Sequence, residues 1–246
     1  MNLVNKEYQK KARQILNLWR DESQSQDIIE EPSSAQIASM IDHTLLKPDA
    51  SIAAVNKLCR EAKDHGFASV CVNPVHVKRC VENLGDDIPT CTVVGFPLGA
   101  NESAIKAEEA RRAVEQGARE LDMVLNVGLL KTANFQEVYE DIKSVRAADM
   151  GVVLKVILET CLLSQEEIII ASMLCREAGA DFVKTSTGFS TGGATKEDVW
   201  LMRFVVKQDL EVKASGGIKT RADAVQMIRA GATRLGASAG IEIVKG

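Results

Sequence analysis

Four charged residues lie in segments that otherwise have the composition of buried β-strands. They are Asp122 in "ELDMVLN", Lys155 in "VVLKVIL", Lys184 in "DFVKTSTG" and Lys213 in "LEVKAS". Because burying an unpaired charge costs several kcal/mol, each residue needs an oppositely charged partner or a shifted pKa. A structural ion pair accounts for any single one, but four on consecutive strands favour a catalytic site.

Three lysines and one carboxylate suit Schiff-base chemistry. Neighbouring ammonium groups repel each other and burial disfavours charge, so both effects favour a neutral, nucleophilic amine. Such an amine attacks a carbonyl carbon, and the resulting iminium draws electrons from a nearby C–C bond. Asp122 and a second lysine are suited to transfer the protons, and no metal is required. The residue types alone leave open which of the three lysines is the nucleophile.

These residues need a scaffold that brings consecutive strands together. Strand-like segments alternate with helical patterns, and they are "MIDHT", "SVCV", "TCTVVGF", "ELDMVLN", "VVLKVIL", "DFVKT", "LEVKAS" and "TRLGAS". This alternation over 246 residues predicts an α/β fold, a closed (β/α)8 barrel whose catalytic groups converge at the C-terminal mouth. An open doubly wound sheet is the alternative, but its G-x-G-x-x-G fingerprint after the first strand is missing.

Four glycines support the same division of the chain. Gly66, Gly117, Gly179 and Gly231 each follow a helical pattern and precede a strand-like segment. A glycine at this place closes a helix in the left-handed conformation without a Cβ clash. The number of residues between successive glycines of this set is enough for two βα units of about 30 residues each.

Composition narrows the function classes. Hydrophobic residues make up 46% and aromatic residues 4%, which indicates an aliphatic core. The net charge of −4 and the lack of a basic stripe argue against a nucleic-acid partner, and no apolar run reaches the roughly 18 residues of a membrane span.

The six cysteines form no C-x-x-C pair and follow no signal peptide, which favours a reducing cytoplasm. The three histidines show no zinc-ligand spacing, so no metal site is expected.

Residues 1–33 differ from the rest of the chain. They are charged and poor in core residues, which favours a solvated arm. The alternative is a helix that covers part of the barrel or of a neighbouring subunit through Leu3, Ile15, Leu18 and Trp19. We therefore expect an N-terminal polar, helical extension over 1–33 and a catalytic barrel domain over 34–246.

Glycine-rich turns follow the last two predicted strands. They are "KASGGIKT" at 213–220 and "RLGASAG" at 234–240. At these strand ends a barrel usually holds a phosphate through backbone N–H groups and the N-terminus of a short helix. The pattern predicts a phosphorylated substrate.

With these segments assembled, the chain resembles the deoxyribose-phosphate aldolase family of class I aldolases over about residues 35–241. The matching segments are "IDHTLLKPD", "VCVNP", "VVGFPLGA", "ELDMVLNVG", "LKVILE", "DFVKTSTGF", "VKASGGIKT" and "RLGAS". The resemblance implies reversible cleavage of 2-deoxy-D-ribose 5-phosphate to acetaldehyde and D-glyceraldehyde 3-phosphate. It also implies a role in deoxyribose phosphate catabolism and no cofactor.

The resemblance assigns roles by position. Lys184 matches the Schiff-base lysine, Lys213 the neighbour whose charge favours a neutral amine there, and Asp122 the proton-transfer residue, which acts with a water. Asp42 and Lys155 match polar residues that line the same site, and Thr185 shapes the pocket. The phosphate end is matched by Gly188, Gly216, Gly217, Gly236 and Ser238.

Two departures from the family pattern are visible. Some members carry a lysine where this chain has Phe189, and some end in a tyrosine that reaches the site, whereas this sequence reads "IEIVKG". Proton exchange is then expected to depend on Asp122, Lys213 and water. The rival hypotheses are another Schiff-base barrel, such as a transaldolase or keto-acid aldolase, and a sugar-phosphate-binding barrel without activity. The expected partners are the sugar phosphate, acetaldehyde and further copies of the chain.

Overall fold

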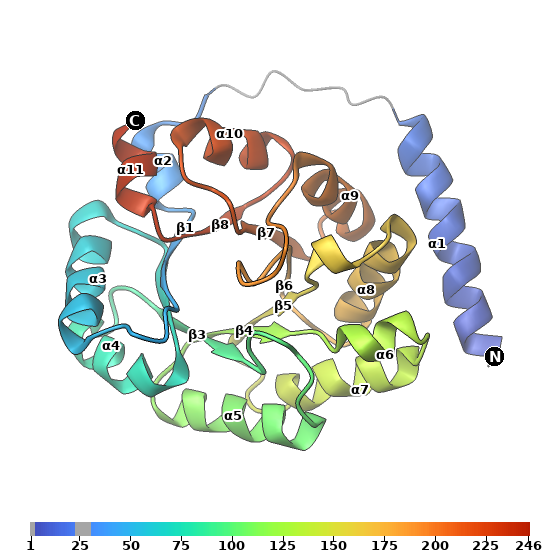
Figure 1. The fold of residues 1–246 in the computed structure, drawn as a ribbon, viewed down its shortest axis with the longest axis horizontal. Helices are drawn as coiled ribbons and strands as arrows, with labels where there is room; N and C mark the ends of the chain where they lie inside the picture. The colour runs from blue at the N-terminus through green and yellow to red at the C-terminus, as the bar shows by residue number, and fades with distance from the viewer. Residues whose placement is uncertain (1–2, 23–30) are drawn as a thin grey trace.

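A closed barrel of eight parallel strands forms the centre of the molecule in the computed structural model, which describes residues 3–22 and 31–246. The strands follow the sequence order around the barrel (Figure 1), which confirms the predicted (β/α)8 fold. They are β1 (Ile41–Leu45), β2 (Ser69–Val72), β3 (Thr90–Val94), β4 (Glu120–Val124), β5 (Val153–Ile157), β6 (Phe182–Lys184), β7 (Glu211–Ser215) and β8 (Arg234–Ala237).

Helices surround this barrel and connect each strand to the next (Figure 1). The ring is formed by α3 (Ile52–His65), α4 (Val77–Leu84), α5 (Ser103–Glu115), α6 (Val127–Lys131), α7 (Phe135–Arg146), α8 (Gln165–Glu177), α9 (Lys196–Val206), α10 (Arg221–Arg229) and α11 (Gly240–Lys245). Two 3-10 turns, η1 (Pro74–His76) and η2 (Thr160–Leu162), follow β2 and β5. Before β1 lie α1 (Leu3–Asp21) and α2 (Ser34–Ala38).

Local sequence signals explain where these helices begin and end. The side chains of Ser51, Ser164, Thr195 and Thr220 accept hydrogen bonds from backbone N–H groups at the starts of α3, α8, α9 and α10. The four glycines predicted to close helices all have positive φ, from 66° to 106°. This confirms the helix ends that the sequence indicated.

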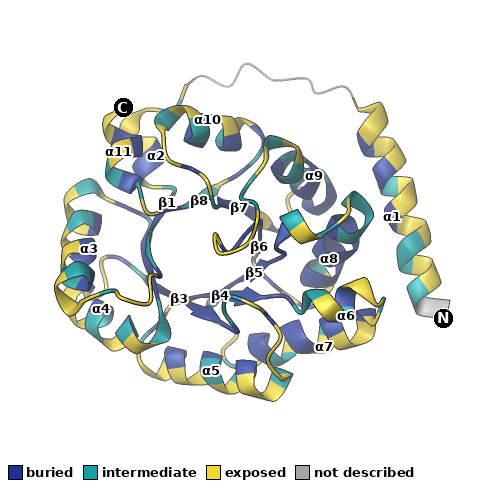
Figure 2. Cartoon of the chain, viewed as in Figure 1, coloured by how far each residue is buried: buried dark blue, intermediate teal, exposed yellow. Residues whose placement is uncertain are grey.

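Burial separates the barrel strands from the outer faces of the helices (Figure 2). Strands β2, β3 and β4 are buried at every position, as expected for a sheet covered on both faces. The core is mainly aliphatic, with Val, Ile, Leu and Ala side chains filling the space between sheet and helices. Charged residues inside the strands are therefore the exceptions that need an explanation.

The N-terminal helix packs on the barrel, so the interpretation of a solvated arm was wrong. Ala12, Leu16 and Trp19 of α1 are buried, and the Trp19 ring lies 4.7 Å from that of Trp200 on α9, beside α8 (Figure 1). The predicted apolar stripe was partly wrong, because Leu18 is 62% exposed on the opposite face. The side chain of Leu3 lies outside the described residues. An amphipathic face, rather than overall composition, decides whether such a helix docks.

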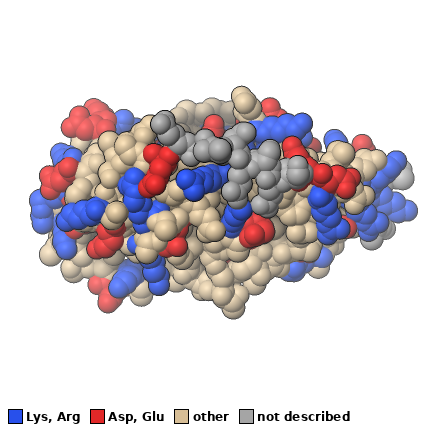
Figure 3. Space-filling view, turned by 90° about the horizontal axis from the view of Figure 1, so that it is seen from above, with Lys and Arg blue, Asp and Glu red and all other residues tan. Residues whose placement is uncertain are grey.

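The surface carries charges of both signs. On the face shown in Figure 3, basic and acidic side chains are interspersed over the described residues. Within 3–22 and 31–246, no helix combines the length and apolar character needed to cross a membrane. All six cysteines are free thiols, and five of them are buried.

Candidate active site

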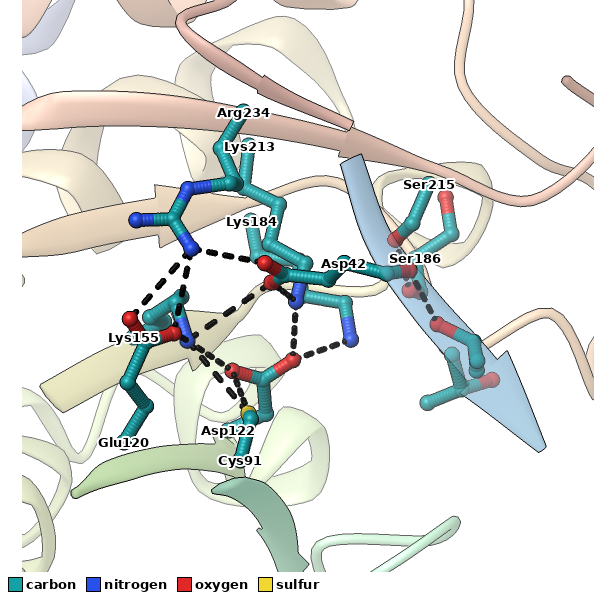
Figure 4. A network of polar contacts seen from close by, with 12 residues as sticks. Asp42, Cys91, Glu120, Asp122, Lys155, Lys184, Ser186, Lys213, Ser215 and Arg234 are labelled. Atoms are coloured by element: carbon teal, nitrogen blue, oxygen red, sulfur yellow. Dashed lines mark hydrogen bonds and ion pairs between the residues drawn. The ribbon is translucent and has the colours of Figure 1, made fainter. Parts of the chain in front are cut away.

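Asp122 on β4 is the centre of a buried polar network inside the barrel (Figure 4). Its Oδ2 atom accepts hydrogen bonds from Lys184 Nζ on β6 at 2.7 Å and from Lys213 Nζ on β7 at 2.6 Å. Its Oδ1 atom accepts from Lys155 Nζ on β5 at 2.9 Å. The structure thus brings together the four charged strand residues that the sequence singled out.

A second set of charges supports this centre from neighbouring strands. Asp42 on β1 is bound by Lys213 Nζ, by Arg234 Nη1 at 2.6 Å and by Ser69 Oγ at 2.7 Å. Glu120 lies 2.6 Å from Lys155 Nζ. Sequence reasoning missed Glu120, Arg234 and Ser69. The signal was present, because "ELDMVLN" and "TRLGAS" each place a further charged residue in a strand-like segment.

The charges in this network do not balance. The cations are Lys155, Lys184, Lys213 and Arg234, against the carboxylates Asp42, Glu120 and Asp122. One cation is therefore in excess when all seven groups are ionised. An excess positive charge in a buried network is electrostatically costly.

The pKa shifts show which groups stay charged. Burial alone would lower the pKa of Lys155 and Lys213, but Asp122 and further buried acidic partners raise both above their ordinary value. Burial likewise would raise the pKa of Asp122 and Asp42, yet the surrounding lysines hold both well below the usual range. Lys155 and Lys213 therefore remain ammonium groups and both aspartates remain carboxylates near neutral pH.

Lys184 alone among the three lysines borders the open cavity at the barrel mouth. This cavity has a volume of about 300 Å³ and is lined by Lys184 together with residues from the loops after β1, β6, β7 and β8. Asp42, Asp122, Lys155 and Lys213 are 0% exposed and lie below it in the barrel interior. Lys184 makes one carboxylate contact, to Asp122, whereas Lys213 contacts two.

The predicted phosphate residues line the same cavity, and they are Gly188, Gly216, Gly217, Gly236 and Ser238. Thr185 does not line it. That side chain is buried and exchanges hydrogen bonds of 3.0 Å with the backbone of Ser215, while Thr187 takes the place in the cavity wall. The last helix, α11, has only six residues, so the predicted contribution of its dipole is small.

Gly236 also makes room for the network beneath the cavity. A Cβ atom at this position would lie 2.8 Å from Ser215 Cβ and 3.2 Å from Lys213 Cε. Any larger residue would therefore force Ser215 to shift and crowd the Lys213 side chain. The glycine serves the buried lysine as well as the cavity wall.

Cys91 on β3 also belongs to the network. Its Sγ atom lies 3.2 Å from Asp122 Oδ1 and 3.4 Å from Lys155 Nζ. Cys71 on β2 is its register partner, and both thiols lie within 4.8 Å of an Asp122 oxygen. These donors could be mistaken for a metal site, but each carboxylate among them already has an ammonium partner.

Comparison with known proteins agrees with this geometry. A family model described as DeoC/LacD family aldolase matches residues 36–246. The chain belongs to the DeoC/LacD family of aldolases. The family match begins just before β1 and contains every residue of the polar network and cavity described above.

Individual relatives match most of the length of this aldolase chain. The deoxyribose-phosphate aldolase of Carboxydothermus hydrogenoformans is 59% identical over 219 residues, covering 87% of this chain and 96% of that protein. A crystal structure of a putative deoxyribose-phosphate aldolase from Coccidioides immitis has a TM-score of 0.88 at 43% identity and covers 96% of both chains. The deoxyribose phosphate aldolase of Aeropyrum pernix, described as a unique tetrameric structure, has a TM-score of 0.80 at 36% identity and covers 95% of this chain and 97% of its own.

Proposed function

We propose that the chain is a class I aldolase that reversibly cleaves 2-deoxy-D-ribose 5-phosphate to acetaldehyde and D-glyceraldehyde 3-phosphate. The observation that carries the mechanism is the position of Lys184. It is the one lysine of the buried network that reaches the cavity, and it shares a carboxylate oxygen with a second lysine. The names of the relatives at 59% and 43% identity support the substrate.

In the proposed reaction, the neutral Lys184 amine attacks C1 of the open-chain sugar and water leaves to give an iminium. The C2–C3 bond then breaks as the C3 hydroxyl loses its proton, releasing D-glyceraldehyde 3-phosphate and leaving an enamine on Lys184. Protonation of the enamine carbon and addition of water release acetaldehyde and regenerate the amine. Each step moves a proton and none needs an oxidant or reductant.

The groups below Lys184 support these proton transfers. Lys213 remains an ammonium group because Asp42 and Asp122 raise its pKa, and its charge 2.6 Å from Asp122 Oδ2 disfavours a second charge on Lys184. Asp122 is the group within hydrogen-bond distance of the Lys184 amine, at 2.7 Å. We therefore assign proton transfer to Asp122, with water from the cavity, and a positioning role to Lys155 and Asp42.

The substrate phosphate is placed against the turns after β6, β7 and β8. Gly188 and Gly217 border the cavity, and in the described parts of the chain their backbone N–H groups have no hydrogen-bond partner. Phe189 adds no charge there, so backbone N–H groups near Gly216, Gly217 and Ser238 hold the anion. The backbones of Gly193 and Gly216 pack closely together, because a Cβ atom at Gly193 would lie 2.3 Å from Gly216 O.

Three further assignments are part of the proposal. Residues 34–246 form the catalytic domain and residues 1–33 an extension of it, supported by the family match that begins at residue 36. Self-association of the chain is supported by the Aeropyrum pernix relative, which is described as tetrameric. The pathway is the degradation of deoxyribose phosphates.

The decisive experiment combines turnover with trapping. The enzyme is assayed for cleavage of 2-deoxy-D-ribose 5-phosphate, and separately treated with acetaldehyde and borohydride before peptide mass spectrometry. We expect turnover and a two-carbon adduct on Lys184. An adduct confined to Lys155 or Lys213 would contradict the assignment of the nucleophile, and absence of turnover with this substrate would contradict the function.

A further inference from the structure

Glu159, which lies between β5 and η2, has a backbone conformation that residues other than glycine rarely adopt. Its φ and ψ are 58° and 60°, in the left-handed region. Ala133 and Lys207 are the other non-glycine residues with positive φ in the part of the chain that the structure describes. Such backbone strain costs about 1–3 kcal/mol and persists where the surrounding structure enforces it, often at functional sites.

The strain arises from an extra residue in the ladder between β5 and β6. Leu158 N donates to Lys184 O at 2.9 Å, and Thr160 N donates to Thr185 O at 3.0 Å. In a regular parallel ladder, N–H groups two residues apart bind carbonyls two residues apart. Here they bind consecutive carbonyls, so Glu159 is an inserted, bulge-like residue directly beside Lys184. Bulges of this kind re-aim a side chain and occur next to active sites.

The re-aimed carboxylate binds the turn that follows Lys184. Glu159 is only 4% exposed, and its Oε1 atom accepts from Thr187 N at 3.3 Å while Oε2 accepts from the Thr187 hydroxyl. The same hydroxyl oxygen accepts from Phe189 N at 3.0 Å. One carboxylate therefore determines the conformation of residues 187–189 through two successive sets of hydrogen bonds.

This turn forms walls of two adjacent cavities. Thr187 and Phe189 line the main cavity with Lys184 and Gly188, and they also line a smaller cavity of about 120 Å³ that contains Glu159. Phe189 packs edge-on against Phe96 at 5.2 Å, so the turn also contacts the loop after β3. The position of Thr187 therefore determines where the N–H groups of this turn lie and how the turn borders the two cavities.

We propose that Glu159 is a positioning residue that holds the turn 187–189 in the geometry needed to bind the substrate phosphate. This inference rests on the proposed function. Positive φ alone does not mark such a residue, because exposed Lys207 has it too. Glu159 differs in that its carboxylate is buried and binds the turn that follows Lys184. The strained backbone at Glu159 places its side-chain oxygens within reach of both the N–H and the hydroxyl group of Thr187.

The test compares Glu159→Gly with Glu159→Gln. Glycine relieves the positive φ but removes the carboxylate, so the melting temperature should change little because the two effects oppose each other. We expect kcat/KM for 2-deoxy-D-ribose 5-phosphate to fall about tenfold or more, mainly through KM. Unphosphorylated deoxyribose should be affected much less. Glutamine keeps an acceptor oxygen at the same reach and should retain most of the activity.

Hydrogen exchange supplies a readout that does not need turnover. The backbone amides of Thr187 and Phe189 should exchange faster in Glu159→Gly than in the unmodified enzyme, while amides of β5 and β7 stay protected. The matched control is Lys207→Gly, which relieves another positive φ, of 50°, at an exposed site after α9. It should stabilise the protein and leave activity and exchange in 187–189 unchanged.

Each outcome separates this inference from the proposed function. If the unmodified enzyme does not cleave the phosphorylated sugar, the proposed function fails regardless of Glu159. If the enzyme is active and Glu159→Gly keeps kcat/KM within about twofold, with unchanged exchange at 187–189, the positioning role is wrong. An equal loss with both substrates, accompanied by a lower melting temperature, would overturn it in favour of a structural role.

Discussion

Lys184 and Lys213 donate to the same atom, Oδ2 of Asp122, at 2.7 and 2.6 Å. They are register partners on β6 and β7, so the sheet itself holds their backbones side by side. Lys213 has a second carboxylate partner in Asp42, whereas Lys184 has none and reaches the cavity. This asymmetry supports the proposal that Lys213 stays charged while Lys184 reacts with the substrate.

Removing that permanent charge should impair catalysis more than folding. In Lys213→Met, the neighbouring ammonium group is lost and Lys184 no longer shares Asp122 Oδ2 with Lys213. In the proposed mechanism this change disfavours the neutral amine that attacks the sugar. We expect kcat to fall by about a hundredfold or more, with the remaining activity shifted to higher pH. A pH–rate profile measured beside circular dichroism checks this. Near-normal turnover with an unshifted profile would show that Lys213 serves only the structure.

The buried carboxylates should make the fold sensitive to acid. The pKa of Asp122 and of Asp42 is held below the ordinary value of 3.8, so both bind protons more readily in the unfolded chain. Their contribution to stability is complete above pH 3.8 and is lost as the pH falls below it. Urea unfolding as a function of pH should show this decline. Asp122→Asn should be less stable at neutral pH and show a shallower decline, whereas the exposed Asp64→Asn should follow the unmodified protein.

A negative charge in the cavity wall should oppose the substrate phosphate. Ser238 borders the cavity, so Ser238→Asp should sharply lower kcat/KM for 2-deoxy-D-ribose 5-phosphate, by about tenfold or more, and affect unphosphorylated deoxyribose much less. Ser190→Asp is the control, because Ser190 lines the smaller cavity only. Equal losses with both substrates would place the phosphate elsewhere.

The docked N-terminal helix should contribute to global stability. Trp19 is 7% exposed and lies against Trp200, so Trp19→Ala should lower the free energy of unfolding by about 3 kcal/mol. Leu18→Ala, on the exposed face of the same helix, should change it by less than about 0.5 kcal/mol. Chemical denaturation of both variants measures the difference. Equal effects of the two substitutions would mean that α1 does not dock as described.

The sequence alone determined the barrel elements and indicated where the candidate site lies. Alternation of strand-like and helical patterns with closing glycines predicted the barrel, because these signals depend on neighbours in the chain. Charged residues within the aliphatic strands Glu120–Val124, Val153–Ile157, Phe182–Lys184 and Glu211–Ser215 marked the site, because burial makes unpaired charges costly wherever the partners lie.

Only the tertiary structure decided how these residues are paired. Lys213 binds Asp42 from 171 positions away, and no local pattern relates the two. The structure also separated Lys184 at the mouth from Lys155 and Lys213 below it, and placed Trp19 inside and Leu18 outside the face that α1 buries. Depth in a barrel and the choice of a buried helix face depend on which distant groups compete for the same space, and a linear pattern does not contain that information.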